Sequence, residues 1–480
     1  MKNKILISVL IGLLIIGSVL VLRHYSSVKR LSSVEKELKE ELQKLKEAGI
    51  PTTIEELNLP EIPDKENGAL IYRKAFELKD SLKMKYKEII ASSPHQNMRT
   101  RWEEVPEEKK KEVVEFILNN PDFADFYKVL EKATKMECRF SINEDYKKGI
   151  SYDTKVGAGL RSCARDLADK AKIEREYGNI EESLQASLVG LKLAKSLANE
   201  PGIIYQLVRF AMDDIALHEL EETLNKEGEN LELCKALIDE IDKERKPNIM
   251  NLALKRELSC HVLPFFYRYK EQGKEAFELT EEQKQIEKTD PNAKDLLESI
   301  KAQKQALKDA YRKSGCITPE EFFIKEGTFS LKTKSKVIPL TEKPYWQVYK
   351  ELEEIDKEIK NLQEKGLLSD MILPSNQMIY MSEALCDARL GAAEIAIANK
   401  IYKQKQGGYA DSLSQLTPGI LSILPLDPFT GKDYIYKKKV QGFIVYSLGE
   451  NVKDDNGTKR VYQQDSPAYE NYDIVWEIDN

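Results

Sequence analysis

Hydrophobic residues recur at helical spacing along most of this chain. Between residues 28 and 48, apolar residues separated by Glu and Lys follow one another at steps of three or four: Leu31, Val34, Leu38, Leu42 and Leu45. Such steps place side chains on one face of an α-helix, and Gly49 and Pro51 are suited to end it. Similar patterns, bounded by Pro and Gly, continue over residues 106–362. We therefore predict a long all-α body of helices packed as hairpins.

The N-terminus has a different pattern, an apolar run without charge. Residues 5–22 are mostly Ile, Leu and Val, and at about 1.5 Å per residue such a run approaches the thickness of a bilayer core. We predict that residues 1–27 form an uncleaved, single-pass membrane anchor and that most of the chain is extracytoplasmic. The alternative is a cleaved signal peptide, but the segment that follows Leu22 is a poor cleavage site.

The pattern changes again near Pro374. Residues 378–406 have helical spacing around an Ala-rich middle, and Gly407-Gly408 follows them. Beyond this point, short runs of β-branched and aromatic residues predict three strands at residues 434–436, 443–447 and 473–478. The first two strands flank Gln441-Gly442, which suits a hairpin. We predict one helix packed on a small antiparallel sheet.

Together these patterns predict a mainly α protein of three parts. Residues 1–27 are the transmembrane helix, residues 28–373 are the helical body, and residues 374–480 are a small α+β domain. A length of 480 residues agrees with this division, because it is too long for one compact core.

Composition narrows the classes of function. Charged residues make up 32% and hydrophobic residues 41% of the chain, a balance that excludes a multi-span membrane protein. The formal net charge is -7 with both signs interspersed, so the sequence lacks the basic face that nucleic-acid binding requires. The six cysteines are far apart without a C-x-x-C pair, which excludes zinc-ribbon and thioredoxin-like sites. We expect them to be small buried residues in helices.

A series of short motifs follows the last predicted helix. In chain order they are Gly407-Gly408-Tyr409, Leu426-Asp427-Pro428-Phe429-Thr430-Gly431, Tyr446-Ser447-Leu448-Gly449 and Asp473-Ile474-Val475-Trp476. Each motif is weak by itself, but the ordered set resembles the C-terminal domain of type II secretion major pseudopilins over roughly the last fifth of the chain. The resemblance implies a domain of one helix on a sheet that docks on a pilin-like or secretion assembly.

The N-terminus departs from that family. Pseudopilins begin with a basic leader, a cleavage Gly, the sequence Phe-Thr-Leu and a Glu inside the apolar helix. Residues 5–22 contain neither Phe-Thr-Leu nor Glu. We therefore do not expect a pilus subunit. The chain is more similar to large, membrane-anchored envelope proteins that end in a pseudopilin-like tail, a resemblance from which no activity follows.

The resemblance to pseudopilins also implies a calcium site in the loop before the last strand. Ca²⁺ takes about six to eight oxygen ligands from carboxylates and carbonyls. The chain offers the carboxylates of Asp454, Asp455 and Asp473, and the main-chain oxygen of Leu448, although the spacing is not that of an EF-hand. The alternative is a plain polar turn without metal, because Asn456-Gly457 is by itself a strong turn signal.

Catalytic chemistry has no local signature in this sequence. Asp214, His218 and Glu222 recur at steps of four and share a helix face, which makes a metal half-site conceivable. A solvated or salt-bridged face is the interpretation that we favour, because no second helix carries an obvious set of partner ligands. The sequence contains no H-E-x-x-H, G-x-S-x-G or P-loop pattern. We therefore nominate no catalytic and no cofactor-binding residue.

Two functions from different classes remain open. The first is a non-catalytic, membrane-anchored envelope protein, whose helical body is an interaction surface for other proteins and whose tail docks on a secretion or pilus-like assembly. The second is an extracytoplasmic hydrolase with its active site in a groove of the helical body. A deep cleft lined by inward-facing acids favours the hydrolase, whereas a convex body with only exposed charges favours the interaction protein.

Overall fold

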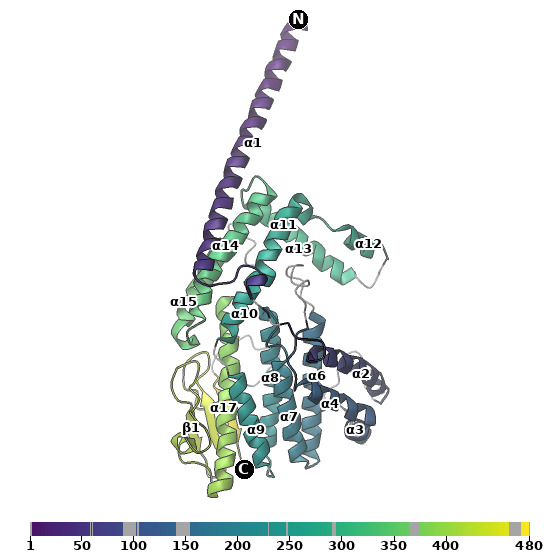
Figure 1. The fold of residues 1–480 in the computed structure, drawn as a ribbon, viewed down its shortest axis with the longest axis vertical. Coiled ribbons are helices and arrows are strands. Elements are labelled where there is room, and N and C mark those ends of the chain that lie inside the picture. Colours follow the sequence, from purple (N-terminus) through teal and green to yellow (C-terminus); the bar gives the residue numbers. More distant parts are fainter. Residues whose placement is uncertain are drawn as a thin grey trace.

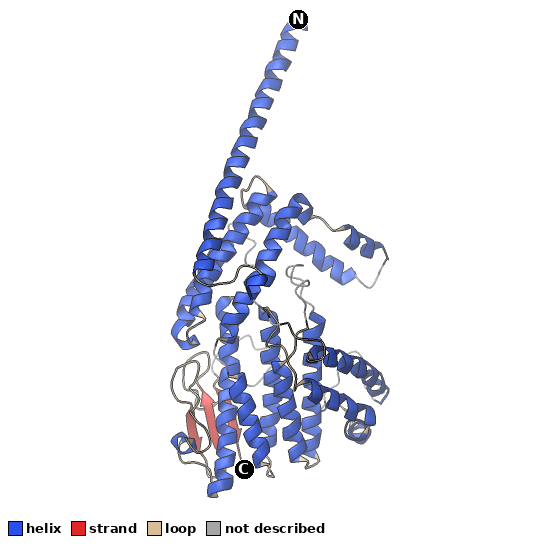
Figure 2. Ribbon diagram, in the orientation of Figure 1, coloured by secondary structure: helices blue, strands red, loops and turns tan. Residues whose placement is uncertain are grey.

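The computed structural model describes residues 2–57, 59, 61–89, 102, 105–140, 154–228, 230–245, 248–289, 294–363, 375–459 and 472–479. Helices account for 72% of the chain and strands for 5%, which confirms the mainly α fold (Figure 2). A small antiparallel sheet near the C-terminus is also confirmed.

The elements follow one another in the order seen in Figure 1. The helices are α1 (Lys2–Glu47), α2 (Gly68–Ile89), α3 (Glu107–Val114), α4 (Pro121–Ala133), α6 (Thr154–Glu176), α7 (Ile180–Lys195), α8 (Ile203–Leu224), α9 (Leu231–Glu244), α10 (Ile249–Glu257), α11 (Leu263–Gln272), α12 (Glu281–Thr289), α13 (Lys294–Lys313), α14 (Pro319–Leu340), α15 (Tyr345–Gln363) and α17 (Asn376–Gln406). The strands are β1 (Ile435–Lys438), β2 (Phe443–Ser447) and β3 (Ile474–Ile478).

The body contains antiparallel helix pairs, as the sequence predicted. α6 and α7 form a hairpin that turns at Gly178, whose φ of +81° suits a residue without a side chain. α8 packs on both helices of this hairpin (Figure 1). Local signals start the helices: Asn120 caps α4 by accepting from the Asp122 main-chain N–H at 2.9 Å, and Thr318 caps α14.

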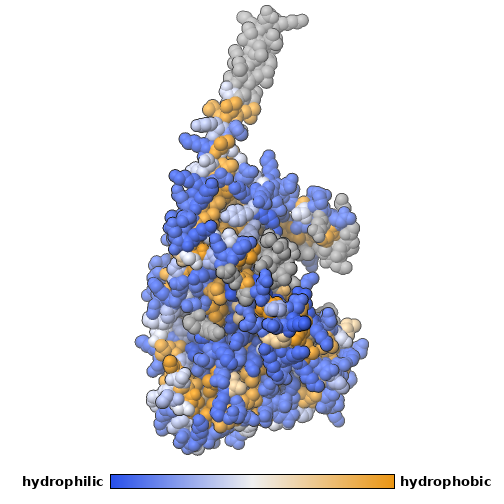
Figure 3. Space-filling model, in the orientation of Figure 1, coloured by the Kyte–Doolittle hydropathy of each residue, from blue (hydrophilic) through white to orange (hydrophobic). Residues whose placement is uncertain are grey.

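The N-terminal helix corrects one sequence-based prediction. The second half of α1 lies against α14, where Arg30 pairs with Glu321 at 2.9 Å, while its first half extends away from the body (Figure 1). The exposed apolar side chains of residues 19–22 gather where α1 leaves the body (Figure 3).

Within the described residues, no helix combines the length and the apolarity that a membrane crossing requires. The predicted single-pass anchor at residues 1–27, and the membrane localisation that depended on it, are therefore wrong. The physical reason lies in the length of the apolar run. Residues 5–22 rise about 26 Å as a helix, less than the roughly 30 Å of a bilayer core, and the helix continues without a break into the charged sequence after Leu22.

The tail has the predicted helix and the three predicted strands. The sheet order is β1-β2-β3, and both pairs are antiparallel, with Tyr436 opposite Val445 and Val445 opposite Trp476. The sheet packs on α17, which stands between the strands and helices α8 and α9 (Figure 1).

α17 is central to the molecule because its middle is buried on all sides. Ser375 caps its start and Gly407, with a φ of +80°, ends it. Every residue from Leu390 to Ile401 is buried, and one hydrophobic core includes side chains of α8, α9, α17 and the sheet. The small residues of its Ala-rich middle let neighbouring elements approach closely on every face. A second core joins α2, α4, α6 and α7.

Candidate functional site: an acidic cleft between the helical body and the tail

A cavity of about 650 Å³ lies where the body meets the tail. Its floor comes from α8, α17 and the end of α9, and its rim comes from the start of α15 and from the tail loop of residues 422–428. Among its described lining residues are eight acidic residues and two arginines. The lining of the cleft is therefore strongly acidic.

The first arginine, Arg209 of α8, binds the last residue of α9. Its Nε donates to Glu244 Oε2 at 3.0 Å and a second guanidinium nitrogen donates to the same oxygen, while a third bond reaches Gln206. The side chains of Arg209 and Glu244 are 6% and 0% exposed. Because both charges are buried, the removal of either partner leaves a costly unpaired charge.

The second arginine, Arg245, joins α9 to α17. Its Nε donates to Asp387 Oδ1 and its Nη1 donates to Glu394 Oε2, both at 2.8 Å. Burial raises the pKa of both carboxyls, and the nearby guanidinium opposes that rise. Asp387 and Glu394 are seven residues apart, so two turns of one helix present both acids to the same cation.

Glu383, also on α17, caps the start of α10. Its two carboxyl oxygens accept from the main-chain N–H groups of Ile249 at 2.9 Å and Met250 at 3.3 Å. A carboxylate is favoured at a helix N-terminus, where the free N–H groups carry partial positive charge. Burial nevertheless raises the pKa of Glu383 to about 8, against the lowering effect of the two N–H donors.

Two carboxyl oxygens on the floor have no partner among the residues that the structure describes. Asp213 Oδ1 and Glu244 Oε1 are buried and make no hydrogen bond to any described residue. Burial raises the pKa of Asp213 well above its usual range, the charge of Glu244 raises it further, and Arg209 opposes both effects. Buried polar atoms are nearly always hydrogen-bonded, so two unpartnered acceptors in one cavity point to a missing donor.

The rim of the cleft is aromatic and apolar. Tyr345, Trp346 and Tyr380 line it, and Ile423 and Leu426 of the tail loop are 78% and 52% exposed. The indole of Trp346 lies on the main chain at Gly431, where the Cβ of any other residue would sit 2.6 Å from Trp346 Nε1. A polar floor below an apolar rim is the usual composition of a ligand site.

The predicted calcium ligands lie in the tail, outside this cleft. Asp473 Oδ2 accepts from the Gly457 main-chain N–H at 2.7 Å, and Asp473 Oδ1 accepts from that of Asp455 at 3.5 Å. Burial raises the pKa of Asp473, the two main-chain N–H donors oppose that rise, and the charges of Asp455 and Asp454 add to it. Leu448 lies at the end of β2, where its main-chain N–H donates to Asp427 Oδ2 at 3.3 Å.

Asp454 lies in a hydrogen-bonded turn of the tail. Asp454 Oδ1 accepts from the Tyr446 hydroxyl and the Asn456 main-chain N–H, both at 2.9 Å, as in a self-contained turn. The described residues contain no group of three or more His, Cys, Asp or Glu side chains arranged to hold a metal ion. Calcium therefore stays a prediction.

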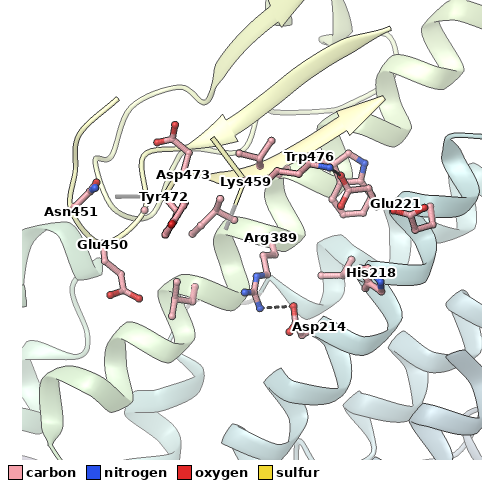
Figure 4. A pocket seen from close by; sticks show the side chains of 17 residues that line it. Asp214, His218, Glu221, Arg389, Glu450, Asn451, Lys459, Tyr472, Asp473 and Trp476 are labelled. Atoms are coloured by element: carbon pink, nitrogen blue, oxygen red, sulfur yellow. Dashed lines mark hydrogen bonds and ion pairs between the residues drawn. The ribbon is translucent and has the colours of Figure 1, made fainter. Parts of the chain in front are cut away.

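Asp214, His218 and Glu222 line a second cavity, between α8, α17 and β3 (Figure 4). Asp214 Oδ1 accepts from the guanidinium of Arg389 on α17. The salt-bridged interpretation of this helix face is thus confirmed at Asp214.

Sequence reasoning missed the acidic cleft, although a signal was present. Glu394 interrupts the Ala-rich middle of the last predicted helix, and Asp387 lies two turns before it on the same face. A charged residue within an apolar helix face indicates a buried ion pair. Its partner, Arg245, is about 150 residues away, so only the tertiary structure identifies it.

Comparisons with known proteins give no information about the function of this chain. No protein-family model matches the chain, and neither the curated proteins nor the solved structures include a significant match. The resemblance of the tail to pseudopilins consequently stays a prediction.

Proposed function

We propose that this chain is a non-catalytic interaction protein whose acidic cleft binds a cationic group, an ammonium or a guanidinium. The observation that carries the proposal is the pair of buried, unpartnered acceptors, Asp213 Oδ1 and Glu244 Oε1. A cation supplies the missing donors and also offsets the excess of eight acids over two arginines among the described lining residues. Charge-assisted hydrogen bonds of this kind are about twice as strong as neutral ones.

The rim supports the same chemistry. Trp346, Tyr345 and Tyr380 line the entrance to the floor, and aromatic faces attract cations by about 0.5–2 kcal/mol. A side chain such as Lys or Arg has an apolar stem below its charged head, which matches an apolar rim above a charged floor.

The partner that we propose is a protein that presents a Lys or Arg side chain. The resemblance of the tail to the major pseudopilin domain supports a docking role on a pilin-like or secretion assembly. A free amine is the other source of the same chemistry, and the binding experiment separates the two sources.

The test measures binding by calorimetry with two probes. Butylguanidinium represents a free cation, and acetyl-Ala-Arg-Ala-amide represents a side chain within a partner. We expect the peptide to bind more tightly, and Asp213→Asn to weaken its binding by about tenfold or more through the loss of one charged acceptor. The control is Asp411→Asn, at an exposed acid that lines neither cavity, and it is expected to leave the affinity unchanged. Equal affinity of wild type and Asp213→Asn for both probes would refute the proposal.

The pH dependence gives a second check. Because the pKa of Asp213 is raised in the free protein, a cation must displace its proton on binding. Affinity should therefore rise with pH and fall as the solution is acidified, with proton release in the calorimeter. The proton release should disappear in Asp213→Asn.

A second candidate, a hydrolase, is favoured by the raised pKa of Asp213 and by the deep, acid-lined cleft. Protonated Asp213 would donate its proton to the leaving atom of a scissile bond, while Glu244 Oε1 would take a proton from the attacking water. General acid–base catalysis contributes about 10²–10⁴-fold to a rate. Hydrolysis of arginine p-nitroanilide that decreases as pH rises, and that is lost in Asp213→Asn, would establish this function in place of the first.

A further inference from the structure

The second cavity, of about 540 Å³, lies between α8, α17 and β3 (Figure 4). α8 contributes Asp214 and His218, α17 contributes Arg389, and β3 contributes Trp476. None of the residues that line this cavity lines the acidic cleft, so an inference from it does not depend on the proposed function.

A buried donor without a partner lines this cavity. Trp476, in the middle of β3, is only 3% exposed, and its Nε1–H has no acceptor among the described residues. An indole nitrogen can only donate, and a buried Trp usually satisfies it. The group that is missing beside Trp476 is therefore an acceptor, such as the carbonyl oxygen of a ligand.

Three acids of the cavity are already bonded to other groups. Asp214 Oδ1 accepts from the guanidinium of Arg389. Glu221 Oε1 accepts from Lys459 at 2.8 Å and from a main-chain N–H of β3 at 3.0 Å. Asp473 accepts from two main-chain N–H groups of the tail, and Lys459 bridges it beside β3. These contacts close the outer edge of β3, so a ligand reaches the indole from the helices and not along the strand.

An apolar hollow adjoins the cavity along the two helices. It measures about 200 Å³, lies between α8 and α17, and shares Leu217 and Leu385 with the cavity. Its lining also includes Leu207, Phe210, Ala211, Ser382 and Cys386. From Ser382 to Ala392, which lines the cavity, α17 rises about 15 Å. The cavity and the hollow together, the α8/α17 groove, suit an extended apolar chain with a polar head at the end near β3.

The charges around the cavity select an uncharged head. Five acidic residues and two basic residues, Arg389 and Lys459, are among its described lining residues. Both basic residues are already paired, with Asp214 and Glu221 respectively. The excess of acids repels a carboxylate, and an ammonium has no acceptor to offer Trp476. An amide, ester or ketone supplies the acceptor without adding charge.

We propose that the α8/α17 groove binds a medium-chain acyl compound with an uncharged head, such as a fatty amide. The carbonyl oxygen of the ligand accepts from the Nε1–H of Trp476. Its alkyl chain lies between α8 and α17 and extends towards Leu207. Burial of the chain supplies most of the affinity, and the hydrogen bond to Trp476 selects the head.

The experiment uses the full chain with isotopically labelled tryptophan and records the indole N–H resonances. The chain has three tryptophans, and each reports on a different place. Trp476 lines the groove and Trp346 lines the acidic cleft, while Trp102 donates to Glu176 at 2.8 Å and serves as a reference. Substitution of each Trp by Phe assigns the resonances.

Three probes of equal chain length compare the heads: octanamide, octanoate and octylammonium. We expect octanamide to move the Trp476 indole proton downfield and saturably, because a new hydrogen bond forms there. Octanoate should bind about tenfold more weakly, because the acids around the cavity repel it. Octylammonium should leave the Trp476 proton in place. Acetamide keeps the head without the chain, so it should bind more weakly than octanamide by at least about tenfold.

A matched pair of variants tests the donor itself. Trp476→Phe keeps an aromatic ring and removes the N–H, so it should weaken octanamide binding by about tenfold in calorimetry. Trp346→Phe makes the same chemical change in the acidic cleft and should bind octanamide as wild type does.

Three results would overturn the inference. One is a Trp476 resonance that does not move at millimolar octanamide. Another is an equal movement of that resonance with octanamide and with octylammonium, a comparison that does not require any variant to fold. The third is a shift confined to Trp346 with every probe, which would place the probes in the acidic cleft and leave the proposed function standing.

Discussion

At the scale of single residues, Asp213 combines burial with a missing partner. It is 1% exposed, the Cys386 thiol donates to its Oδ2 at 3.8 Å, and its Oδ1 is unpartnered among the described residues. Burial disfavours the ionised form of such an acid, because ionisation without solvent is costly. Such residues reduce stability and are retained at functional sites.

Asp213→Asn should stabilise the protein at neutral pH. The raised pKa of Asp213 means that the folded state retains a proton that the unfolded chain releases above about pH 4. The contribution of Asp213 to the free energy of unfolding therefore falls as the pH rises from about 4 towards the pKa of Asp213 in the folded state. Asn cannot ionise, so the variant should gain about 1–3 kcal/mol at pH 7, and the gain should shrink towards pH 4.

Thermal melts between pH 4 and pH 8 measure this effect. Asp411→Asn, at an exposed acid paired with Lys438, is the control and should change stability by less than about 0.5 kcal/mol. A lower melting temperature for Asp213→Asn at pH 7 would show that the ionised form is the stable one.

The predicted calcium ligands of the tail lead to a testable expectation. Burial, and after it the charges of Asp455 and Asp454, raise the pKa of Asp473, so a bound cation should relieve the cost of these negative charges. Ca²⁺ at about 100-fold above its dissociation constant should stabilise the fold by about 2–3 kcal/mol, and Mg²⁺ should do less. Thermal melts in chelator, Ca²⁺ and Mg²⁺ measure this. Identical curves in all three would leave the plain polar turn as the correct interpretation.

At the scale of elements, one close contact between α17 and the rest of the tail lies at Gly391. The Tyr434 hydroxyl donates to the Ala388 carbonyl at 3.0 Å, and the ring lies over Gly391. A Cβ at Gly391 would sit 2.9 Å from Tyr434 Cζ, which is closer than atoms pack. Tyr434 is 3% exposed and has no room to retreat.

Gly391→Ala should consequently destabilise the protein by about 1–3 kcal/mol, because overpacking displaces the ring and its hydrogen bond. Gly157→Ala is the matched control on α6, where the new Cβ meets Val208 at an ordinary 3.6 Å. That substitution should be neutral or stabilising by up to about 1 kcal/mol, since Ala favours a helix more than Gly does. Chemical denaturation of both variants measures the difference, and equal effects would contradict the packing argument.

At the scale of the whole molecule, body and tail share one core. Ile395 of α17, Leu220 of α8, Leu237 of α9 and Val445 of β2 belong to the same buried cluster. The sequence pattern near Pro374 predicts that residues 374–480 fold by themselves. The shared core leads to the opposite expectation, because a domain that folds alone normally has its own core.

A fragment of residues 374–480 should therefore lack a cooperative melt. Removal of α8 and α9 exposes one whole apolar side of α17, and the sheet that remains has only three strands. A longer fragment of residues 154–480 keeps these helices and should melt cooperatively. Circular dichroism of both fragments tests this, and a sharp transition in the short one would restore the division at Pro374.

The sequence by itself determined most of the secondary structure and the character of the tail. Helical spacing, Gly178 and the β-type runs around Gly442 are local signals, so most helices, the turn at Gly178 and the three strands were predictable. Residues 332–340 are an exception: their polar sequence suggests an extended linker, but they continue helix α14. The small side chains of Ala392–Ala398 also indicated a helix that neighbouring elements approach closely. The prediction of a membrane anchor from the apolar run of residues 5–22 was wrong because that signal, too, is local. A local pattern does not say what a segment packs against.

Only the tertiary structure decided which charges meet. Arg245 reaches Glu394 across about 150 residues, and Arg389 reaches Asp214 across about 175. Glu and Asp are so common in this chain, at 81 residues, that no spacing distinguishes a buried acid from a solvated one. Burial is what raises the pKa of Asp213 and leaves its oxygen without a partner, and burial is a property of the whole fold.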